Sequence, residues 1–432
     1  MTRASTEQVP PQTLRKVIVA AGIGNFVEWF DFAVYGFLAT TIAQQFFPSG
    51  DASAALLKTF AVFAVAFAFR PLGGIFFGML GDRIGRKRTL AMTILLMAGA
   101  TTLIGLLPTY AAIGVTAPIL LSLIRCAQGF SAGGEYAGAC AYLMEHAPSD
   151  KRAWYGSFIP VSTFAAFASA AVVAYALEAS LSAEAMGSWG WRLPFLIAAP
   201  LGLVGLYLRW RLDETPAFQA VKQEHAVAHS PLKETLRNHG AAICCLGAFV
   251  SLTALSFYMF TTYFATYLQV AGGLSRATAL LVSLIALIFA AAICPLAGWY
   301  SDRVGRRVTV MTACGLLMGV VYPSFLMASS GSFAASIIGV MLLAVGAVLC
   351  GVVTAALLSE TFPTRTRYTA SAITYNMAYT IFGGTAPLVA TWLISTTGSN
   401  LSPAFYLIAV ALLALAGGLA LPETSRISLH DA

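Results

Sequence analysis

Residues 78–87 read GMLGDRIGRK, and residues 298–307 read GWYSDRVGRR. The two aspartates of this repeat, Asp82 and Asp302, lie about half the chain apart in a protein of 432 residues. Each copy joins two long apolar runs, so a dense cationic turn occupies the same place in both halves. The repeat therefore predicts two fused and similar helical bundles.

The composition predicts that these bundles lie in a lipid bilayer. Hydrophobic residues make up 58 % of the chain and charged residues only 10 %, whereas a soluble domain carries about 25 % charged residues. The net charge of +7 does not indicate a nucleic-acid partner, because the basic residues are scattered through short loops and form no basic domain. We expect an all-α membrane protein surrounded by lipid.

Turn signals divide the chain into twelve apolar segments, each long enough to cross the hydrocarbon core, which takes about 20 residues. The segments are 17–46, 57–80, 89–107, 113–143, 153–177, 191–210, 241–269, 276–298, 308–328, 333–360, 366–394 and 401–421. They predict twelve transmembrane helices in two pseudo-symmetric six-helix bundles. The N-terminal bundle covers residues 1–210, a cytoplasmic linker covers 211–240, and the C-terminal bundle with a short tail covers 241–432.

Lysine and arginine set the expected orientation, because these residues stay on the cytoplasmic side of short loops. If both chain ends are cytoplasmic, most of the basic residues fall on that side, and only Lys58 and Arg276 fall outside. We expect a multi-pass protein of the cell (inner) membrane that has both termini in the cytoplasm and acts as a monomer.

Two further markers repeat between the halves. Glu145 at the end of the fourth segment matches Glu360 at the end of the tenth, and Asp213-Glu214-Thr215 matches Pro422-Glu423-Thr424. At these residues the chain resembles the major facilitator superfamily over nearly its whole length, although Tyr300 stands where the superfamily motif has leucine. The resemblance implies a two-bundle transporter that exposes a central site alternately to each side of the membrane.

The cytoplasmic turns are where gating contacts are then expected. The candidate gating residues are Asp82, Arg83, Arg86, Glu145, Asp302, Arg303, Arg306 and Glu360. We expect Asp82 to cap a helix end or to bridge to an arginine across the bundle interface, because an acidic residue is not needed to fix topology. The basic residues of the turn have a second interpretation as topology determinants.

A narrower resemblance lies in four other motifs. They are GNFVEWFDF at 24–32, RPLGG at 70–74, QGFSAGGEY at 128–136 and WGWRLPF at 189–195. These motifs look like those of the metabolite:proton symporter family, which includes proline/betaine, α-ketoglutarate, citrate and shikimate carriers. The sequence PLGLVGLYLR at 200–209 is most similar to the proline/betaine branch. Osmosensing members of that branch carry a long charged C-terminal extension, and the resemblance does not reach that feature.

Five ionisable residues fall deep within the segments: Glu28, Asp31, Arg70, Arg125 and Glu135. A charge at the bilayer centre costs roughly 2.5–3.5 kcal/mol on insertion scales, so these groups should pair or face a water-filled cavity. Glu28 and Asp31 are three residues apart and share one helix face. Asp31 and Arg125 are expected at similar depth, where an ion pair is geometrically allowed, and Arg70 is placed to serve either carboxylate.

These charges predict a coupled binding site. A solute carboxylate that captures an arginine would free the acidic partner to take a proton. We therefore predict Asp31 or Glu135 as the proton carrier, with Glu28 beside them, and Arg125 with Arg70 as the anchor for a solute carboxylate. Other candidate substrate-binding residues are Gln128, Tyr258, Asn376 and Tyr379, and the tyrosines are suited to grip a methylated ammonium by cation–π contact. The alternatives are fixed ion pairs needed for folding and tyrosines that only pack.

The favoured hypothesis is a proton-coupled symporter that imports a small carboxylate-bearing solute, with a zwitterion of the proline/betaine type slightly ahead of a di- or tricarboxylate such as α-ketoglutarate or citrate. A non-transporting membrane receptor is an alternative of another class. We do not expect an enzyme, because no nucleophile–base spacing is present. No cofactor or metal is expected, since the five histidines lie in loops or the tail and no Walker-type phosphate loop occurs.

Overall fold

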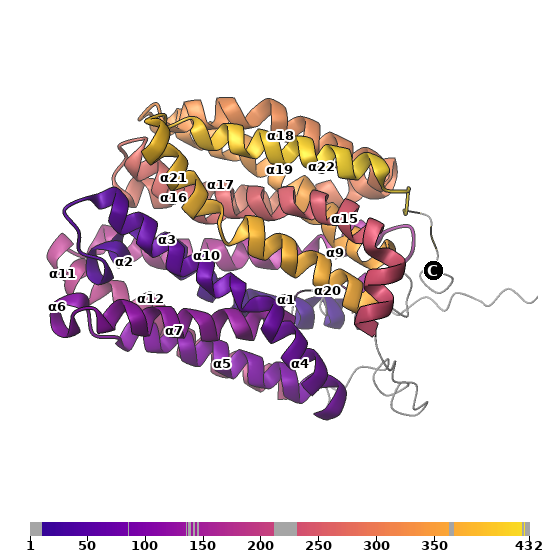
Figure 1. Ribbon diagram of the computed structural model, residues 1–432, viewed down its shortest axis with the longest axis horizontal. Helices are drawn as coiled ribbons and strands as arrows, with labels where there is room; N and C mark the ends of the chain where they lie inside the picture. The colour runs from indigo at the N-terminus through magenta and orange to yellow at the C-terminus, as the bar shows by residue number, and fades with distance from the viewer. Residues whose placement is uncertain are drawn as a thin grey trace, which may run out of the picture.

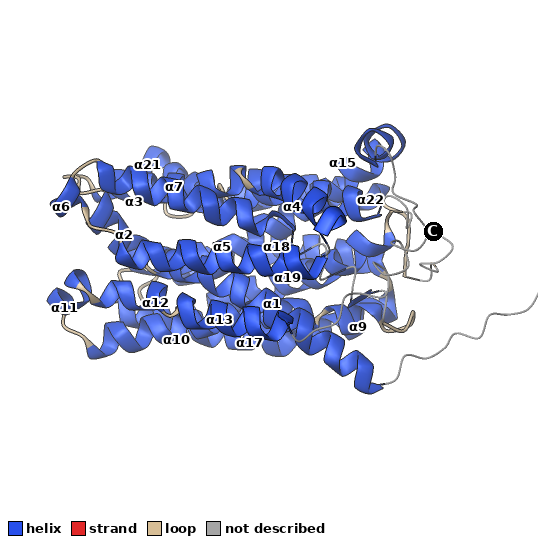
Figure 2. Ribbon diagram, turned by 90° about the horizontal axis from the view of Figure 1, so that it is seen from below, coloured by secondary structure: helices blue, strands red, loops and turns tan. Residues whose placement is uncertain are grey.

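The computed structural model describes residues 11–84, 86–134, 136, 140, 143–144, 147–210, 231–362, 367–425 and 427. Within these residues the regular structure is helical and contains no strand (Figure 2). Nine helices of the described chain are long and apolar enough to cross a membrane, and the bent pair formed by α1 and α2 makes a tenth.

The described residues of the first half form fourteen helical elements, most of which are labelled in Figure 1. The helices are α1 (Pro11–Phe37), α2 (Ala39–Phe46), α3 (Ala52–Ala68), α4 (Arg70–Ile84), α5 (Arg86–Leu106), α6 (Tyr110–Ile113), α7 (Thr116–Ser131), η1 (Ala132–Gly134), α9 (Arg152–Gly156), α10 (Phe158–Ser180), α11 (Ala183–Ser188), η2 (Gly190–Arg192), α12 (Leu193–Leu196) and α13 (Ala198–Trp210). Several predicted spans therefore contain more than one helix. In the first of them, α1 and α2 meet at a 63° bend.

The second half contains longer helices. They are α15 (Pro231–Tyr258), the π-helical η3 (Met259–Tyr263), α16 (Phe264–Val270), α17 (Arg276–Val304), α18 (Arg306–Ala328), α19 (Phe333–Glu360), α20 (Arg367–Ala378), the π-helical η4 (Tyr379–Gly383), α21 (Ala386–Thr397) and α22 (Ser402–Ala420). Of the predicted linker, residues 211–230 lie outside the described residues, and α15 already begins at Pro231.

In the described part of the chain, helices occupy all twelve predicted spans, which confirms the predicted fold class. The two predicted spans that are not among these ten long apolar helices contain α5 and α7. Helix α7 has only 16 residues before the 3-10 turn of η1. The long helices run along the long axis of the molecule, with the first half (indigo to magenta) below the second half (red to yellow) in Figure 1. Between the halves, α10 packs on α17 and α3 packs on α21.

The surface has the polarity expected for a protein in lipid. Large apolar side chains such as Leu106, Leu203 and Leu296 are more than half exposed. By contrast, the charged side chains of Arg70 and Arg125 are fully buried. Polar groups therefore gather inside the molecule and apolar groups face outward, the reverse of a soluble protein.

Glycines allow the helices that carry these arginines to cross at backbone contact. A Cβ atom on Gly129 of α7 would overlap the carbonyl oxygen of Ala66 in α3, and one on Gly73 of α4 would overlap the carbonyl oxygen of Phe130. Small residues permit such close helix approach in membranes. The crossing brings Arg70 of α4 and Arg125 of α7 toward the same part of α1.

Candidate functional site

Four of the five predicted ionisable residues lie together in the interior. The side chains of Glu28, Asp31, Arg70 and Arg125 are at most 3 % exposed, and they come from α1, α4 and α7. The fifth, Glu135, lies outside the described residues. Removing charges from water is costly, so the contacts of each group decide what it can do.

One of the three guanidinium nitrogens of Arg70 makes polar contacts, and the other two have no hydrogen-bond partner among the described residues. It begins α4, directly after α3 ends at Ala68, and its Nη2 atom lies 3.7 Å from Glu28 Oε1 and donates to the Ala132 carbonyl oxygen at 3.4 Å. Its Nε and Nη1 atoms are buried and have no hydrogen-bond partner among the described residues. Of the two carboxylates that the sequence left open for Arg70, Glu28 is the one that lies beside it.

Aromatic rings surround the Arg70 guanidinium. Its central carbon lies 5.6 Å from the ring centroid of Phe67, 5.8 Å from that of Phe32 and 6.0 Å from that of Trp29. These distances are in the range in which a cation is attracted to the face of a ring. Rings therefore replace part of the hydration that this cation loses on burial.

Arg125 belongs to a second polar cluster. Its Nη1 atom donates to Gln128 Oε1 at 2.8 Å, and Gln128 Nε2 donates to Thr101 Oγ1 at 2.6 Å. The Arg125 central carbon lies 4.3 Å from the ring centroid of Tyr35. Asp31 is buried on α1 directly before Phe32, whose ring lies 5.3 Å from the Arg125 central carbon.

The ion pair considered for Asp31 and Arg125 is not a direct contact. The Nε and Nη2 atoms of Arg125 have no hydrogen-bond partner among the described residues. Gln128, one turn further along α7, takes the remaining Nη1 donor instead. Sequence spacing predicted the shared depth, but it did not reveal that a neutral amide, Gln128, would be the hydrogen-bond partner of Arg125.

The second half contributes an aromatic wall. The ring centroid of Tyr258 lies 5.2 Å from that of Phe67, 6.2 Å from that of Trp29 and 6.1 Å from that of Tyr379. The Tyr258 hydroxyl is buried and has no hydrogen-bond partner among the described residues. Tyr258 ends α15 where η3 begins, and Tyr379 begins η4, so both flank π-helical turns, which are frequent at functional sites.

Asn376, the other predicted residue of this wall, is engaged across the interface. Its Nδ2 atom donates to the Gly133 carbonyl oxygen at 3.1 Å. Four residues later, Thr380 Oγ1 donates to the Phe67 carbonyl oxygen at 2.9 Å. The two halves are thus bonded directly beside the charged clusters.

A third charged group lies where the end of α17, the start of α18 and the end of α19 meet. Asp302 accepts the backbone N–H groups of Ala153 and Trp154 at 2.9 and 2.8 Å, and so caps α9 of the other half. Arg306 pairs with Asp302 and Glu360, each at 3.0 Å. Asp302 therefore makes the contact that the sequence predicted for its equivalent, Asp82.

The segment after α22 completes this group. Glu423 accepts the backbone N–H groups of Arg306 and Arg307 at 2.8 and 3.0 Å, and Thr424 Oγ1 donates to Glu360 Oε2 at 2.8 Å. Partial burial acts to raise the pKa of Glu423, but its backbone hydrogen bonds outweigh burial and hold the pKa below its usual range. The carboxylate is therefore ionised at neutral pH and caps the start of α18.

Arg152 extends the contact to the first half. Its Nη1 atom donates to the Ile427 carbonyl oxygen at 2.7 Å and lies 3.7 Å from Glu360 Oε1. We call Arg152, Asp302, Arg306, Glu360 and Glu423 the end cluster. It joins the two halves and the C-terminal segment in one network.

The other predicted gating residues lie elsewhere. The side chains of Asp82, Arg83 and Arg86, together with Glu145, lie outside the described residues. Arg303 is exposed and sits 5.2 Å from the ring centroid of Trp299, so it does not join the end cluster.

The opposite end of the interface is bridged as well. Arg276 of α17 donates to Thr41 Oγ1 and Gln44 Oε1, each at 3.2 Å, and Thr40 Oγ1 donates to Gln269 Oε1 at 3.4 Å. Contacts between the halves therefore lie at both ends and around the central charges.

We expect Asp302→Ala to loosen the end cluster. The backbone amides of Ala153 and Trp154 would lose their acceptors, and hydrogen–deuterium exchange there should quicken by roughly tenfold or more, because each lost bond has a charged acceptor. Mass spectrometry of peptides covering α9 measures this rate. Asp51→Ala is the matched control, since Asp51 caps α3 within one half. Unchanged exchange at α9 would contradict the assignment.

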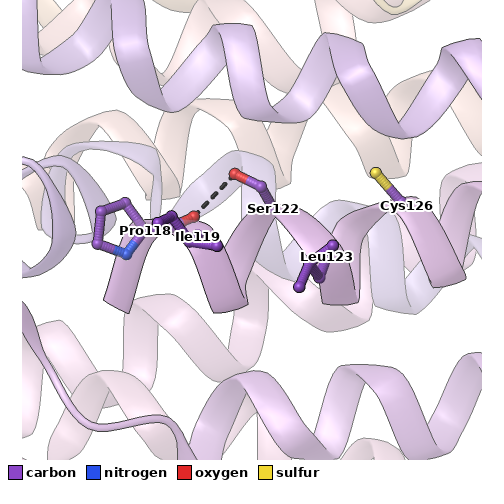
Figure 3. Close-up of a pocket in the computed structure, with 5 residues that line it drawn as sticks. All are labelled: Pro118, Ile119, Ser122, Leu123 and Cys126. Atoms are coloured by element: carbon purple, nitrogen blue, oxygen red, sulfur yellow. Dashed lines mark hydrogen bonds between the residues drawn. The ribbon is translucent and has the colours of Figure 1, made fainter. Parts of the chain in front are cut away.

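A depression on α7 is separate from these clusters. It encloses about 280 Å³ and is lined by Pro118, Ile119, Ser122, Leu123 and Cys126 (Figure 3). Ser122 donates to the Pro118 carbonyl oxygen within the helix, and Ile119 and Leu123 are more than half exposed. This depression faces the lipid side of α7, whereas Arg125 and Gln128 lie on its buried side.

Sequence reasoning missed several residues that shape the site. Trp29 and Phe32 lie beside the predicted carboxylates in the motif at 24–32, and their alternation with Glu28 and Asp31 was the available signal. Arg152 had a weaker signal as a basic residue after the fourth segment. Thr101 carried none, because a lone threonine in an apolar helix is common.

Two bundles bridged at both ends, with paired charges sealed between membrane-spanning helices, define a multi-pass membrane transporter of the two-bundle class. The family model described as "Major Facilitator Superfamily" matches residues 21–387 and, in a second overlapping match, residues 274–429. The chain belongs to the major facilitator superfamily, in the branch of the proline/betaine transporters. Its relatives are transporters and not enzymes.

Curated relatives are similar over most of the chain. The proline/betaine transporter of Salmonella typhimurium is 39 % identical over 97 % of this chain and 85 % of its own length. The glycine betaine/proline/ectoine/pipecolic acid transporter OusA of Dickeya dadantii is 39 % identical over the same shares. The ectoine/proline transporter ProP of Corynebacterium glutamicum is 36 % identical over 97 % of this chain and 86 % of its own.

Solved structures share the fold. The xylose transporter XylE of E. coli, in a partially occluded inward-open conformation, aligns with a TM-score of 0.74 at 20 % identity, over 96 % of this chain and all of its own. A D-xylose-proton symporter aligns with a TM-score of 0.70 at 20 % identity, over 96 % of this chain and 99 % of its own. At this identity the likeness concerns the fold alone.

Proposed function

We propose that this protein is a proton-coupled symporter of the cell (inner) membrane that imports a zwitterionic compatible solute of the proline/betaine type by alternating access, with both termini in the cytoplasm. The observation that carries the proposal is the buried guanidinium group of Arg70, which lies among aromatic rings and has two N–H donor atoms without a partner among the described residues. Such donors suit a carboxylate, and the rings suit a methylated ammonium. The relatives are named for proline, betaine and ectoine, which supports the same class of solute.

Charge balance favours a zwitterion over a dicarboxylate. Among the described residues of the central site, the buried Arg70 and Arg125 are accompanied by two buried carboxylates, Glu28 and Asp31. A zwitterion adds no net charge to this set, whereas a dicarboxylate adds two negative charges in a region of low dielectric constant. Uncompensated buried charge is expensive.

Proton coupling would use Asp31. Its carboxylate lies beside Arg125 without a direct ion pair, so a proton taken up there removes a charge that Arg125 does not fully neutralise. Glu135 stays a second candidate for the same role. Alternating access would require the end cluster or the Arg276 contacts to open in turn.

Uptake into proteoliposomes tests the proposal. With an acidic exterior, purified protein should accumulate radiolabelled glycine betaine and proline, and a protonophore should abolish the accumulation. Parallel assays with α-ketoglutarate, citrate and shikimate serve as the comparison. Gradient-driven accumulation of one of these acids, without accumulation of betaine or proline, would contradict the proposal.

A further inference from the structure

We propose that the two buried arginines have different tasks: Arg70 binds the solute carboxylate, whereas Arg125 serves the proton site with Asp31 and does not contact the solute. This inference rests on the proposed function and assigns its two halves to separate side chains. The sequence alone predicted that both arginines bind the solute carboxylate, and the proposal assigns that role to Arg70 only.

The first argument is position relative to the interface between the halves. The Tyr258 ring of the second half packs against Phe67 and Trp29, at 5.2 and 6.2 Å between centroids, and these two rings contact the Arg70 guanidinium. The carbonyl oxygen of Gly133, next to the Ala132 oxygen that Arg70 contacts, accepts the cross-interface bond from Asn376. A solute at Arg70 would therefore touch both halves, as alternating access requires.

The second argument is the enclosure of Arg125 within the first half. Its guanidinium contacts the rings of Tyr35, Phe63 and Phe32, at 4.3, 5.1 and 5.3 Å from their centroids. Its Nη1 donor is taken by Gln128, which is held in turn by Thr101. Tyr258 of the second half reaches this cluster through the Phe63 ring, at 5.8 Å between centroids, but the hydrogen bonds of Arg125 stay within α5 and α7.

The third argument is that each arginine has its own carboxylate on α1. Arg70 lies 3.7 Å from Glu28. Asp31 is buried three residues further along α1, beside Phe32, whose ring contacts the Arg125 guanidinium at 5.3 Å. Phe32 contacts both guanidinium groups, and no hydrogen bond or ion pair joins the two clusters among the described residues. Because the Phe32 ring contacts both arginines, a change at one site can be transmitted to the other through this side chain.

The chemistry of the two surroundings fits the division. Beside Arg70, Trp29, Phe67 and Tyr258 lie within 5.2–6.2 Å of one another or of the guanidinium. A carboxylate on Arg70 would place an attached methylated ammonium against these rings. Arg125 has a free Nε and Nη2 edge, which suits bidentate contact with a carboxylate, and Asp31 is the acid in range of it.

Paired substitutions test the division. Arg70→Gln should raise the Kd for glycine betaine by roughly 10- to 100-fold, the loss expected for hydrogen bonds to a charged group. Arg125→Gln should leave that Kd within about threefold and retain solute counterflow, but lose proton-driven accumulation. Isothermal titration calorimetry at one pH measures binding, and counterflow in proteoliposomes measures exchange without a proton gradient.

Choline separates a lost anchor from a damaged fold, because it carries the trimethylammonium group without the carboxylate. Arg70→Gln should reduce the preference for betaine over choline and leave choline binding unchanged, and Arg70→Lys should restore part of the preference. Equal loss of betaine binding in the two glutamine variants would overturn the division, as would wild-type affinity in Arg70→Gln. Wild-type protein that binds neither betaine nor proline would instead overturn the proposed function.

Discussion

Replacing Asp31 with asparagine is expected to abolish proton-driven accumulation of solute while exchange of solute across the membrane continues. Asparagine has nearly the size of aspartate, so the packing beside Thr101 and Arg125 should persist. It takes up no proton, however, and the proton gradient then has no means to drive the solute. For each coupled proton, a pH difference of one unit can raise the ratio of internal to external solute by about a factor of ten. In the variant this ratio should stay at one.

The measurement is the ratio of internal to external betaine in proteoliposomes at a pH difference of one unit, together with counterflow at equal pH. Asp51→Asn is the matched control, because Asp51 is an exposed cap at the start of α3, remote from the buried charges. If Asp31→Asn accumulates betaine like the wild type and Glu135→Gln does not, the proton carrier is Glu135 and the assignment to Asp31 is wrong.

Replacing Gly129 with alanine is expected to prevent the protein from folding. The added methyl group would overlap the carbonyl oxygen and carbon of Ala66. Ordinary overpacking costs roughly 1–3 kcal/mol because side chains move aside; here the obstacle is the backbone of α3, which does not. The whole crossing of α3 and α7 would have to separate, and the cost should approach the roughly 5–15 kcal/mol of net stability of a typical protein.

The yield of monodisperse protein in size-exclusion chromatography after detergent extraction measures this effect. Gly99→Ala is the matched control, since Gly99 is also within a helix, α5, and a Cβ there meets nothing within 4 Å. The control should give wild-type yield and melting temperature. Wild-type yield from Gly129→Ala would show that the two backbones do not meet at this point.

The fold could be predicted from sequence because the bilayer imposes a simple rule, that each apolar run of sufficient length becomes a helix. The bend between α1 and α2 escaped prediction because Leu38, where it occurs, is an ordinary helix-forming residue. The π-helical turns at Met259–Tyr263 and Tyr379–Gly383 escaped it as well, since nothing in their local sequence departs from an α-helical pattern.

Which residues form the site could be predicted better than which of them contact each other. A charge in an apolar segment is visible in any sequence, so Glu28, Asp31, Arg70 and Arg125 could be found. Which acid meets which arginine depends on how α1, α4 and α7 rotate against each other, and that rotation is set by packing. Contacts such as the one between Arg152 and Ile427 join residues 275 positions apart, beyond the reach of local pattern.

The two π-helical turns have a mechanical consequence. A π turn accommodates one more residue than an α turn, so conversion of η3 to an α-helix would turn α16 about its own axis by about 100° and advance it by about 1.5 Å. The same holds for η4 and α21. Tyr258 and Tyr379 stand at the starts of these turns. Rotation of α16 or α21 would therefore change which of its side chains face the interface between the bundles, while the neighbouring helices stay in place.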